Sequence, residues 1–274
     1  MPRPERVTEQ DAAGIRVANV ARCALVLRDQ GPATVSQIAS RTGLSRPTVE
    51  SAVLGMVERG LVRDAGQLTS GGRGAGRPAR IFEFRADAGY VVGVDVGIHR
   101  LRVAIADLAG TIVAWRETLV DDSFVGAGRM LRVTQAIRAA LEAASVRPDR
   151  LAAMTVAVSG LVGEDGRLII SRNLGDWEGI DIVGHLRGEF GCPVVVENDM
   201  RLAALAEHRL GAARLMNDVV YIFAGHRISM GLIIDGRLRR GRHSAAGEIG
   251  EIVFSMQVNE RGQLTWKTAT TGER

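Results

Sequence analysis

Apolar and polar positions in the first sixty residues alternate with the period of amphipathic helices. Residues 11–28 predict a first helix, which Gly31 and Pro32 end. The buried face of this helix is expected to carry Ile15, Ala18, Val20, Ala21, Ala24, Leu25 and Leu27. Thr34 is a favourable N-cap for a short second helix over residues 35–41.

A third helix is predicted to begin after Ser45 and to end at Gly60, with Pro47 in its first turn, where a missing N–H costs nothing. The glycine turn at residues 42–44 joins the second and third helices as in a helix-turn-helix. The apolar side of the third helix carries Val49, Val53, Met56 and Val57. Its outward side would face DNA, where arginine pairs with guanine and hydroxyl groups reach phosphates or base edges. The DNA-binding residues that we expect here are Ser45, Arg46, Thr48, Glu50 and Ser51.

Two strand-like runs, residues 61–63 and 79–84, follow the third helix and enclose the glycine-rich sequence GQLTSGGRGAGRP. A helix-turn-helix followed by a hairpin with a basic tip is the winged form of the motif. Arg73 and Arg77 in the tip are expected to bind DNA, because a narrow minor groove attracts arginine. A plain three-helix bundle with a polar surface helix is the alternative interpretation of the helices, and a flexible linker is the alternative interpretation of the glycine-rich segment.

From Tyr90 onward, short β-rich runs alternate with helical ones. Residues 90–97, 101–108 and 111–117 predict three antiparallel strands, and residues 126–144 predict a helix. The apolar side of that helix carries Met130, Leu131, Val133, Ile137 and Leu141. Further strands are expected within residues 151–160, 190–199, 218–225 and 230–238, and an alanine-rich helix over residues 200–211. This alternation predicts the α/β fold class.

Length and composition exclude several classes of protein. With 274 residues, 46% of them apolar, the chain can bury at least one full core. No apolar run reaches the length of a membrane span and the first residues do not resemble a signal peptide, so we expect a cytoplasmic protein without a membrane partner. Cys23 and Cys192 are too few for a disulfide framework or a four-thiolate zinc site. Lys267, the only lysine, does not stand in the context of a P-loop.

The positive charge of the sequence is concentrated in its first third. The formal net charge of the whole chain is +4. Residues 1–85 hold 13 arginines against 8 acidic residues, a balance of +5, whereas residues 86–274 hold 22 basic and 23 acidic residues, a balance of −1. A basic small domain joined to a nearly neutral larger one favours an anionic partner such as DNA, although five charges also fit an ordinary solvated surface.

Five motifs follow one another along the chain: GPATVSQIASRTGLSRPTVESAVLGMVERGLVRD, GRPARIFEF, GVDVG, VENDMRLAALAE and GRHSAAGEIGE. In this order they resemble the ROK family of repressors, uncharacterised reading frames and sugar kinases, and the helix-turn-helix places the resemblance in the repressor branch. The resemblance implies a winged helix-turn-helix over residues 1–85 and then a ribonuclease-H/actin-like (ASKHA) domain. That domain would have a first lobe over residues 86–200 and an abbreviated second lobe over residues 201–274.

The same resemblance implies a sugar or sugar derivative in the cleft between the lobes. Asp199 matches the family's general base, which takes a proton from a sugar hydroxyl, and Asn198 is its sugar-binding neighbour. Glu248 matches another sugar-contacting position, and Asn173 falls where the family places a loop near the sugar. Asn198 and Asp199 also precede a predicted helix, so capping that helix is the alternative role for the pair.

The sequence departs from the kinases of this family at both phosphate loops. The kinases carry Asp-x-Gly-Gly-Thr where this chain has DVGIH at residues 95–99, and β-branched Ile98 opposes close approach to a phosphate. The second loop, residues 224–231, lacks the run of glycines that exposes backbone N–H groups. Glu251 replaces the family's zinc-binding histidine, and no cysteine follows Cys192. We therefore expect no enzymatic activity, no cofactor and no metal site.

These observations predict a sequence-specific DNA-binding transcription regulator of the repressor type. Its kinase-like domain would sense a sugar or sugar derivative and would join the chain into a homodimer or larger homo-oligomer on a double-stranded operator. Two alternatives stay open: a sugar kinase with a DNA-binding appendage, and a regulator whose kinase-like domain only mediates dimerisation.

Overall fold

The computed structural model describes residues 9–67, 79–120, 125–172, 174–224, 228–249, 255–258 and 264–267. Three residues that the sequence singled out, Arg73, Arg77 and Asn173, lie outside the described residues. No helix within the described part of the chain is long and apolar enough to span a membrane.

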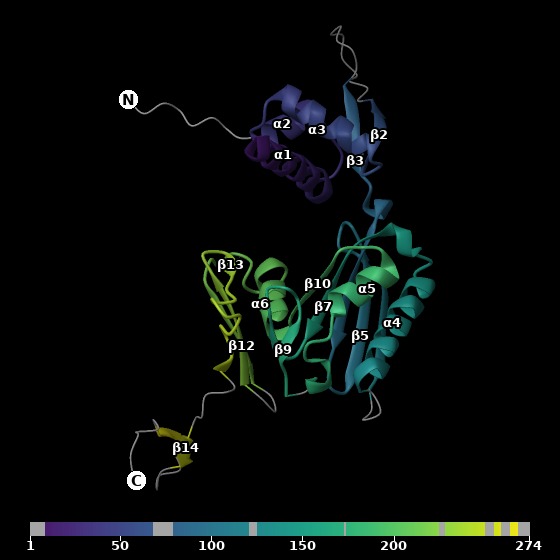
Figure 1. Cartoon of the computed structure of the whole chain (residues 1–274). Coiled ribbons are helices and arrows are strands. Elements are labelled where there is room, and N and C mark those ends of the chain that lie inside the picture. The colour runs from purple at the N-terminus through teal and green to yellow at the C-terminus, as the bar shows by residue number, and fades with distance from the viewer. Residues whose placement is uncertain are drawn as a thin grey trace. The chain divides into compact units, whose positions relative to one another are not determined.

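The N-terminal region is a winged helix-turn-helix (Figure 1). Its elements are α1 (Glu9–Gln30), β1 (Ala33–Thr34), α2 (Val35–Thr42), α3 (Arg46–Glu58), β2 (Val62–Gln67) and β3 (Arg80–Phe84). The strands form an antiparallel sheet in the order β1-β3-β2. The predicted helices and the two wing strands are confirmed, whereas the sequence pattern missed the two-residue strand β1.

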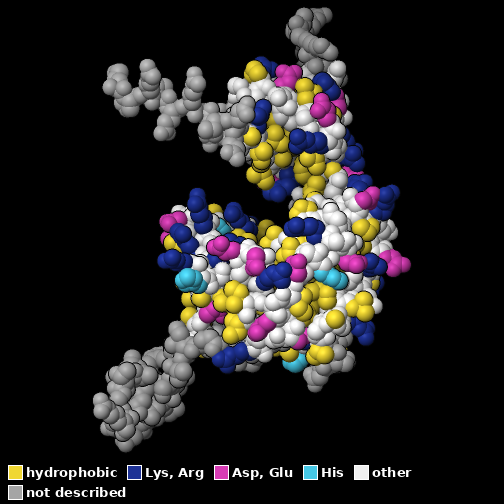
Figure 2. Space-filling model, in the orientation of Figure 1, with side chains coloured by type: hydrophobic (Ala, Val, Ile, Leu, Met, Phe, Trp, Pro, Cys, Tyr) yellow, Lys and Arg dark blue, Asp and Glu magenta, His cyan; other side chains and the backbone are white. Residues whose placement is uncertain are grey.

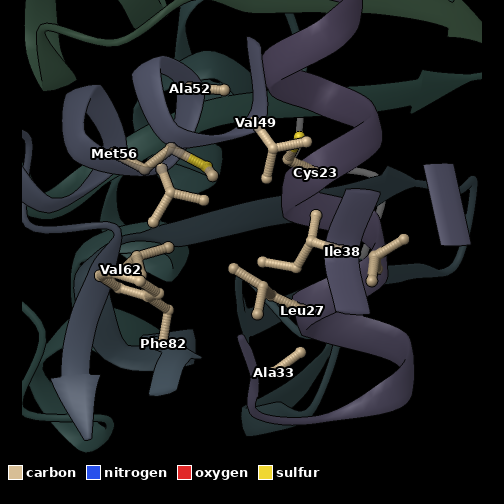
Figure 3. Packing of buried hydrophobic residues seen from close by; sticks show 11 residues of the cluster. Cys23, Leu27, Ala33, Ile38, Val49, Ala52, Met56, Val62 and Phe82 are labelled. Carbon is tan, nitrogen blue, oxygen red and sulfur yellow. The ribbon is translucent and has the colours of Figure 1, made fainter. Parts of the chain in front are cut away.

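One apolar cluster holds this region together (Figure 3). Ile38 of α2 and Val49 of α3 are fully buried, and both helices contact α1. Phe82 closes the cluster from β3. The members of the cluster are Cys23, Val26, Leu27, Ala33, Ile38, Val49, Ala52, Val53, Met56, Val62 and Phe82.

The buried face predicted for α1 is wrong in part. Ile15 is 55% exposed and Leu25 is 45% exposed, and Ala18 and Ala21 are also exposed. Only the second half of α1 reaches the cluster. The buried stripe of the helix consists of Cys23 and the residues three and four positions after it, Val26 and Leu27. Leu25 lies about 200° around the helix from Cys23, which turns its side chain away from that stripe.

The following α/β region contains a five-stranded sheet in the order β10-β7-β4-β5-β6. Its strands are β4 (Tyr90–Val96), β5 (Arg100–Asp107), β6 (Ile112–Leu119), β7 (Leu151–Val158) and β10 (Val194–Asn198). Short turns join β4 to β5 and β5 to β6, a connection length that only antiparallel neighbours allow, whereas β7 and β10 run parallel. The predicted α/β class and the opening antiparallel strands are confirmed.

Two helices, α4 (Gly126–Ala143) and α5 (Ile182–Phe190), lie beside this sheet (Figure 1). On α4 the predicted apolar side is confirmed except for Leu131, which is 56% exposed because it stands off the buried Met130–Val133–Ile137 stripe. The sequence pattern missed α5. Two glycines lower the helix propensity of its sequence, although Ile182, Leu186 and Phe190 are buried at four-residue spacing.

A second sheet with the order β11-β12-β13 packs against helix α6 (Asp199–Arg209). Its strands are β11 (Val219–Ala224), β12 (Ile228–Ile234) and β13 (Arg237–Leu238). The helix approaches β12 closely at Gly231, where a Cβ atom would lie 2.5 Å from the carbonyl oxygen of Met200 and 2.6 Å from the Cβ of Ala204. The remaining described elements are two small hairpins, β8 (Leu161–Val162) with β9 (Leu168–Ile170) and β14 (Ser255–Val258) with β15 (Leu264–Lys267), and three short 3-10 helices over Ala86–Ala88, Pro148–Arg150 and Gly175–Trp177.

Candidate functional site

The turn between α2 and α3 is fixed by local hydrogen bonds. Gly43 ends α2 in the left-handed conformation, with φ of 69°, and its N–H donates to the carbonyl oxygen of Ala39 at 2.9 Å. Ser45 then caps α3, because its Oγ accepts a hydrogen bond from the backbone N–H of Thr48 at 3.3 Å. The hydroxyl groups of Ser45 and Thr48 also share a hydrogen bond of 2.7 Å. These contacts set the direction in which α3 leaves the turn.

The exposed side of α3 carries most of the residues that the sequence predicted for DNA binding. Ser45, Arg46, Glu50 and Ser51 are exposed, and Thr48 is half-buried. The opposite side is buried through Val49, Ala52, Val53 and Met56. Arg46 has no ion-pair partner among the residues that the structure describes, so its guanidinium is available to a ligand.

The base of the wing is less positive than its arginine content suggests. Arg63 pairs with Glu83 at 2.8 Å, and Arg80 pairs with Asp64 at 2.6 Å. The positive charge available to an anionic partner therefore lies mainly on other arginines of the region.

Two further exposed arginines, which the sequence analysis did not single out, stand at the ends of the motif helices. Arg41 lies in the last turn of α2 and Arg59 directly follows α3; both side chains are exposed. Their position at the ends of the two motif helices is the signal that could have identified them.

A second group of predicted residues meets where β10 ends and α6 begins. Asn198 is the N-cap of α6: its Oδ1 accepts from the N–H of Arg201 at 3.1 Å, and its Nδ2 donates to the carbonyl oxygen of Gly160 at 3.0 Å. The capping role that the sequence left open for this residue is therefore confirmed. A sugar contact by Asn198 stays a prediction.

Asp199 is the first residue of α6 and carries an unusual charge environment. Burial is the main cause that raises the pKa of its carboxyl to about 6; the carboxylates of Asp95 and Glu248 add to this rise, and the hydrogen bond from the N–H of Met200 opposes it. The structure thus brings Glu248, from the segment after β13, and Asp95, at the end of β4, into the electrostatic range of Asp199. Three of the four predicted sugar-binding residues, Asn198, Asp199 and Glu248, therefore lie near the head of α6. The fourth, Asn173, lies outside the described residues.

Asp95 is paired with an arginine that sequence reasoning did not single out. Arg102 of β5 donates to Asp95 at 3.1 Å and to Glu117 of β6 at 2.8 Å. The hydrogen bond from Arg102 holds the pKa of Glu117 below its usual range, and Arg100 contributes a second ion pair at 2.7 Å. The only sequence signal for this cluster is the alternation of arginine with apolar residues along β5.

An open pocket of about 350 Å³ lies beside this ion pair. Its lining combines the Asp95–Arg102 pair with apolar surface, including the exposed side chain of Trp115. The lining residues are Gly93, Val94, Asp95, Arg102, Ala104, Trp115, Thr155, Ala157 and Leu202.

Basic side chains also gather over β13 and the segment that follows it (Figure 2). Arg237, Arg239, Arg240 and Arg242 are all exposed there, and two of them pair with carboxylates: Arg239 with Asp235 at 3.2 Å and Arg240 with Glu197 at 2.5 Å. Among the described residues, no group of three His, Cys, Asp or Glu side chains is arranged to hold a metal ion.

The fold and the two groups of residues define a class of protein: a winged helix-turn-helix joined to a sugar-kinase-like α/β domain with an Asn-Asp pair at the head of a helix. Residues 91–263 match the ROK family and residues 14–67 match the MarR family, a winged-helix family. The chain belongs to the ROK family, as the sequence motifs predicted.

Known proteins with both regions are similar to this chain. The xylose repressor of Bacillus subtilis (strain 168) is 28% identical over 224 residues, which are 81% of this chain and 57% of that protein. The crystal structure of a ROK family transcriptional regulator, a homologue of the E. coli MLC protein, matches 91% of this chain and 63% of that chain with a TM-score of 0.72 and 22% identity. This likeness confirms the fold across both regions.

The α/β region that follows the winged helix is also similar to kinases by itself. A ROK family glucokinase from Streptomyces griseus, solved in complex with glucose and AMPPNP, is 31% identical with a TM-score of 0.51 and matches 60% of this chain and 50% of that one. The chain spans less than two thirds of the length of the curated relatives that it matches first.

Proposed function

We propose that this chain is a DNA-binding transcription regulator of the repressor type whose ROK domain senses a sugar. The observation that carries the proposal is α3: its apolar side is buried in the winged helix, while Arg46, Glu50 and Ser51 stay exposed on one face. A helix presented in this way after a glycine turn fits the major groove of B-DNA. The similarity to the xylose repressor supports the regulatory role.

The DNA complex would use two copies of the chain. Homodimerisation would place two α3 helices in successive major grooves, about 34 Å apart. Arg73 and Arg77 of the wing would reach the flanking minor groove or phosphates, and Arg46 would contact a phosphate or a guanine near the start of α3.

The sugar would bind at the head of α6. Asp199 would accept a hydrogen bond from a sugar hydroxyl, and Asn198, Glu248 and Asn173 would contact neighbouring hydroxyls. An ionised carboxylate is the stronger acceptor, so sugar affinity is expected to rise as the pH increases through about 6, where Asp199 loses its proton.

The ROK domain would act without phosphoryl transfer, although its relatives include kinases. Arg102 pairs with Asp95 at 3.1 Å and places a guanidinium beside the carboxylate of the DVGIH sequence. Ile98 in the same turn removes the conformational freedom that a glycine offers to a phosphate loop. Turnover of ATP with a hexose or amino sugar that disappears in Asp199→Asn would favour the kinase alternative instead.

Selection of genomic DNA fragments by the purified chain tests the proposal, at a fixed salt concentration of about 150 mM because phosphate contacts dominate affinity. We expect enrichment of a two-fold symmetric site, weakened by Arg46→Ala. Full-strength binding of that site by a chain carrying both Arg46→Ala and Arg73→Ala would contradict the docking arrangement. A site whose affinity no sugar changes would favour a ROK domain that only mediates dimerisation.

A further inference from the structure

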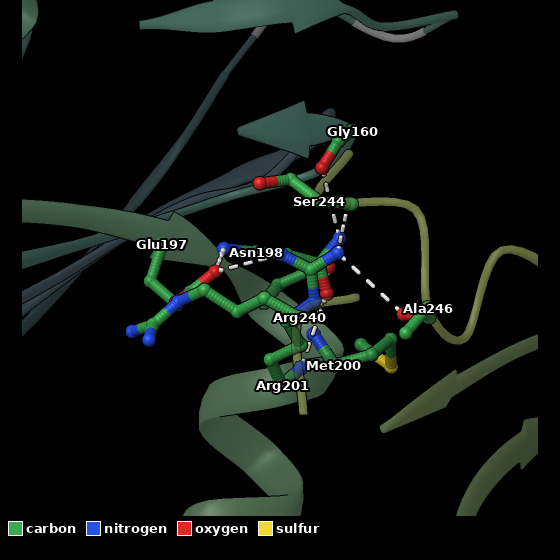
Figure 4. Close-up of polar contacts among 9 residues, drawn as sticks. Gly160, Glu197, Asn198, Met200, Arg201, Arg240, Ser244 and Ala246 are labelled. Carbon is green, nitrogen blue, oxygen red and sulfur yellow. Dashed lines mark hydrogen bonds and ion pairs between the residues drawn. The ribbon is translucent and has the colours of Figure 1, made fainter. Parts of the chain in front are cut away.

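Arg201 is a charged side chain in a place where charges are rarely found. It lies in the first turn of α6 and is only 1% exposed (Figure 4). Its Nη1 donates to Oε1 of Glu197 at 3.1 Å. Its Nη2 donates to the carbonyl oxygen of Ser244 and, at 3.5 Å, to that of Ala246. A buried guanidinium persists only when such partners compensate for its lost hydration.

Glu197 is the centre of this network. Its side chain is 4% exposed, and its Oε2 accepts from Nε of Arg240 at 2.5 Å, while its Oε1 also accepts from the backbone N–H of Asn198 at 2.9 Å. One buried carboxylate thus meets two guanidinium groups. Arg240 is half exposed to solvent, whereas the buried Arg201 shares Glu197 with it and also directs Nη2 at the two carbonyl oxygens, so those contacts help to compensate the buried charge.

The two carbonyl groups belong to a segment that carries a predicted sugar contact. Ser244 and Ala246 precede Glu248 by four and two residues. Gly247 continues the segment against β12, where the N–H of Met230 donates to its carbonyl oxygen at 3.2 Å. At the other end of the network, Asn198 and Asp199 stand two to three residues before Arg201 on the same helix end.

We infer that Arg201 is a positioning residue for the sugar site: its fork holds the segment that carries Glu248 against the head of α6. Because Glu248 and Asp199 come from separate elements, some contact must set their spacing, and Arg201 bonds to one segment while belonging to the other. This inference rests on the proposed sugar site. The contacts need a planar guanidinium, because its two Nη groups donate in different directions, to Glu197 and to the two carbonyl oxygens. A lysine ammonium in the same place is a single point charge and does not have this geometry.

The most direct test measures the pH at which Asp199 titrates and needs no sugar. Carboxyl-carbon NMR of the full chain follows the titration of Asp199, which Asp95 and Glu248 both face. In Arg201→Met we expect Glu248 to move away and the midpoint of Asp199 to fall below that of the wild-type chain. Arg201→Lys keeps the charge beside Glu197 and is expected to shift the midpoint in the same direction by less. Because Arg201→Met also removes a positive charge, whose loss raises the midpoint, Arg201→Lys is the deciding variant: an unchanged midpoint in a folded Arg201→Lys chain would overturn the inference.

A double-mutant cycle then tests whether Arg201 acts through Glu248. Calorimetry with D-xylose and with D-glucose compares the wild-type chain, Arg201→Met, Glu248→Gln and the double variant. We expect Arg201→Met to weaken binding about tenfold, and the double variant to bind no worse than Glu248→Gln alone, because coupled residues are not additive. Fully additive losses would contradict the inference.

Arg239→Met provides the matched control. Arg239 directly follows β13 and is exposed, and among the described residues its side chain pairs with Asp235 alone, at 3.2 Å, so its loss should leave sugar affinity and the Asp199 midpoint unchanged. A wild-type chain that binds neither sugar would count against the proposed sugar site, whereas the NMR midpoints would still decide the role of Arg201.

Discussion

The environment of Asp199 affects stability and, in the proposed sugar site, binding. Burial and the carboxylates of Asp95 and Glu248 all disfavour its charged form and raise its pKa from 3.8 to about 6. The folded protein therefore holds this proton more tightly than the unfolded chain does. Stability is lost as the pH rises from about 4 to about 6, and the full cost is present at higher pH.

Replacing Asp199 by Asn should consequently stabilise the protein above pH 6. A shift of about two pKa units corresponds to a gain of up to about 3 kcal/mol in the free energy of unfolding. The gain should shrink as the pH falls towards 4 and vanish only well below the unfolded pKa of 3.8, where both states of the wild-type chain bind the proton. Urea unfolding between pH 4 and pH 8 measures this, with Asp149→Asn, a substitution in an exposed ion pair, as the control. A gain that is the same at both ends of the pH range would refute the assigned charge environment.

Arg46 is the residue on which DNA affinity should depend most visibly. Its side chain is exposed and has no ion-pair partner in the described part of the chain. Arg46→Ala is expected to weaken operator binding by about 1–3 kcal/mol, as loss of a guanine or phosphate contact does. Fluorescence anisotropy with a selected operator measures the loss. Arg28→Ala is the control because Arg28 lies on α1 and pairs with Asp29 at 2.7 Å; equal losses in both variants would mean that α3 has no special role.

At the scale of elements, the best predictions came from signals that act locally. Ser45 and Gly43 determine where α3 begins through hydrogen bonds within a few residues, so capping rules were sufficient. The buried face of α1 depends instead on how far its partners extend along it, and Ile15 lies beyond them. Only tertiary packing decides such a case, and a sequence pattern does not contain it.

The candidate sugar site also contains residues that local motifs predict and residues that only the fold reveals. Asn198, Asp199 and Glu248 belong to recognisable motifs, and the sequence named all three. Arg102 and Arg201 have roles that exist only through partners: Asp95 and Glu117 for the first, Ser244 and Ala246 for the second. No local signal brings residues 201 and 244 together, so only the folded chain reveals the pair.

The close packing of α6 on β12 gives a prediction for these elements. In Gly231→Ala the new methyl group would lie 2.5 Å from the carbonyl oxygen of Met200, so helix and strand must separate. We expect a loss of about 1–3 kcal/mol in the free energy of unfolding, as overpacking typically costs.

Thermal and urea unfolding measure that loss. Gly188→Ala is the matched control, because Gly188 lies in α5 with no atom within 4 Å of the new Cβ. That variant should gain about 0.5–1 kcal/mol from the higher helix propensity of alanine. A Gly231→Ala chain as stable as Gly188→Ala would show that α6 and β12 are not in tight contact.

At the scale of the whole molecule, the proposed function depends on coupling between two regions with separate chemistry. A sugar at the head of α6 changes DNA affinity only if it binds one arrangement of the two reading helices better than another. The residues of α3 and of the sugar site are therefore expected to affect one measured quantity, the affinity for the operator.

The most direct measurement is the affinity of the full chain for its selected operator with and without saturating sugar, in the wild type and in Asp199→Asn. We predict that one sugar changes the operator affinity of the wild type at least about fivefold, the lower end of typical allosteric coupling. The same sugar should leave Asp199→Asn unchanged although this variant still binds the operator. An operator affinity that no sugar alters in the wild type, or an equal response in Asp199→Asn, would contradict a regulator that senses sugar through Asp199.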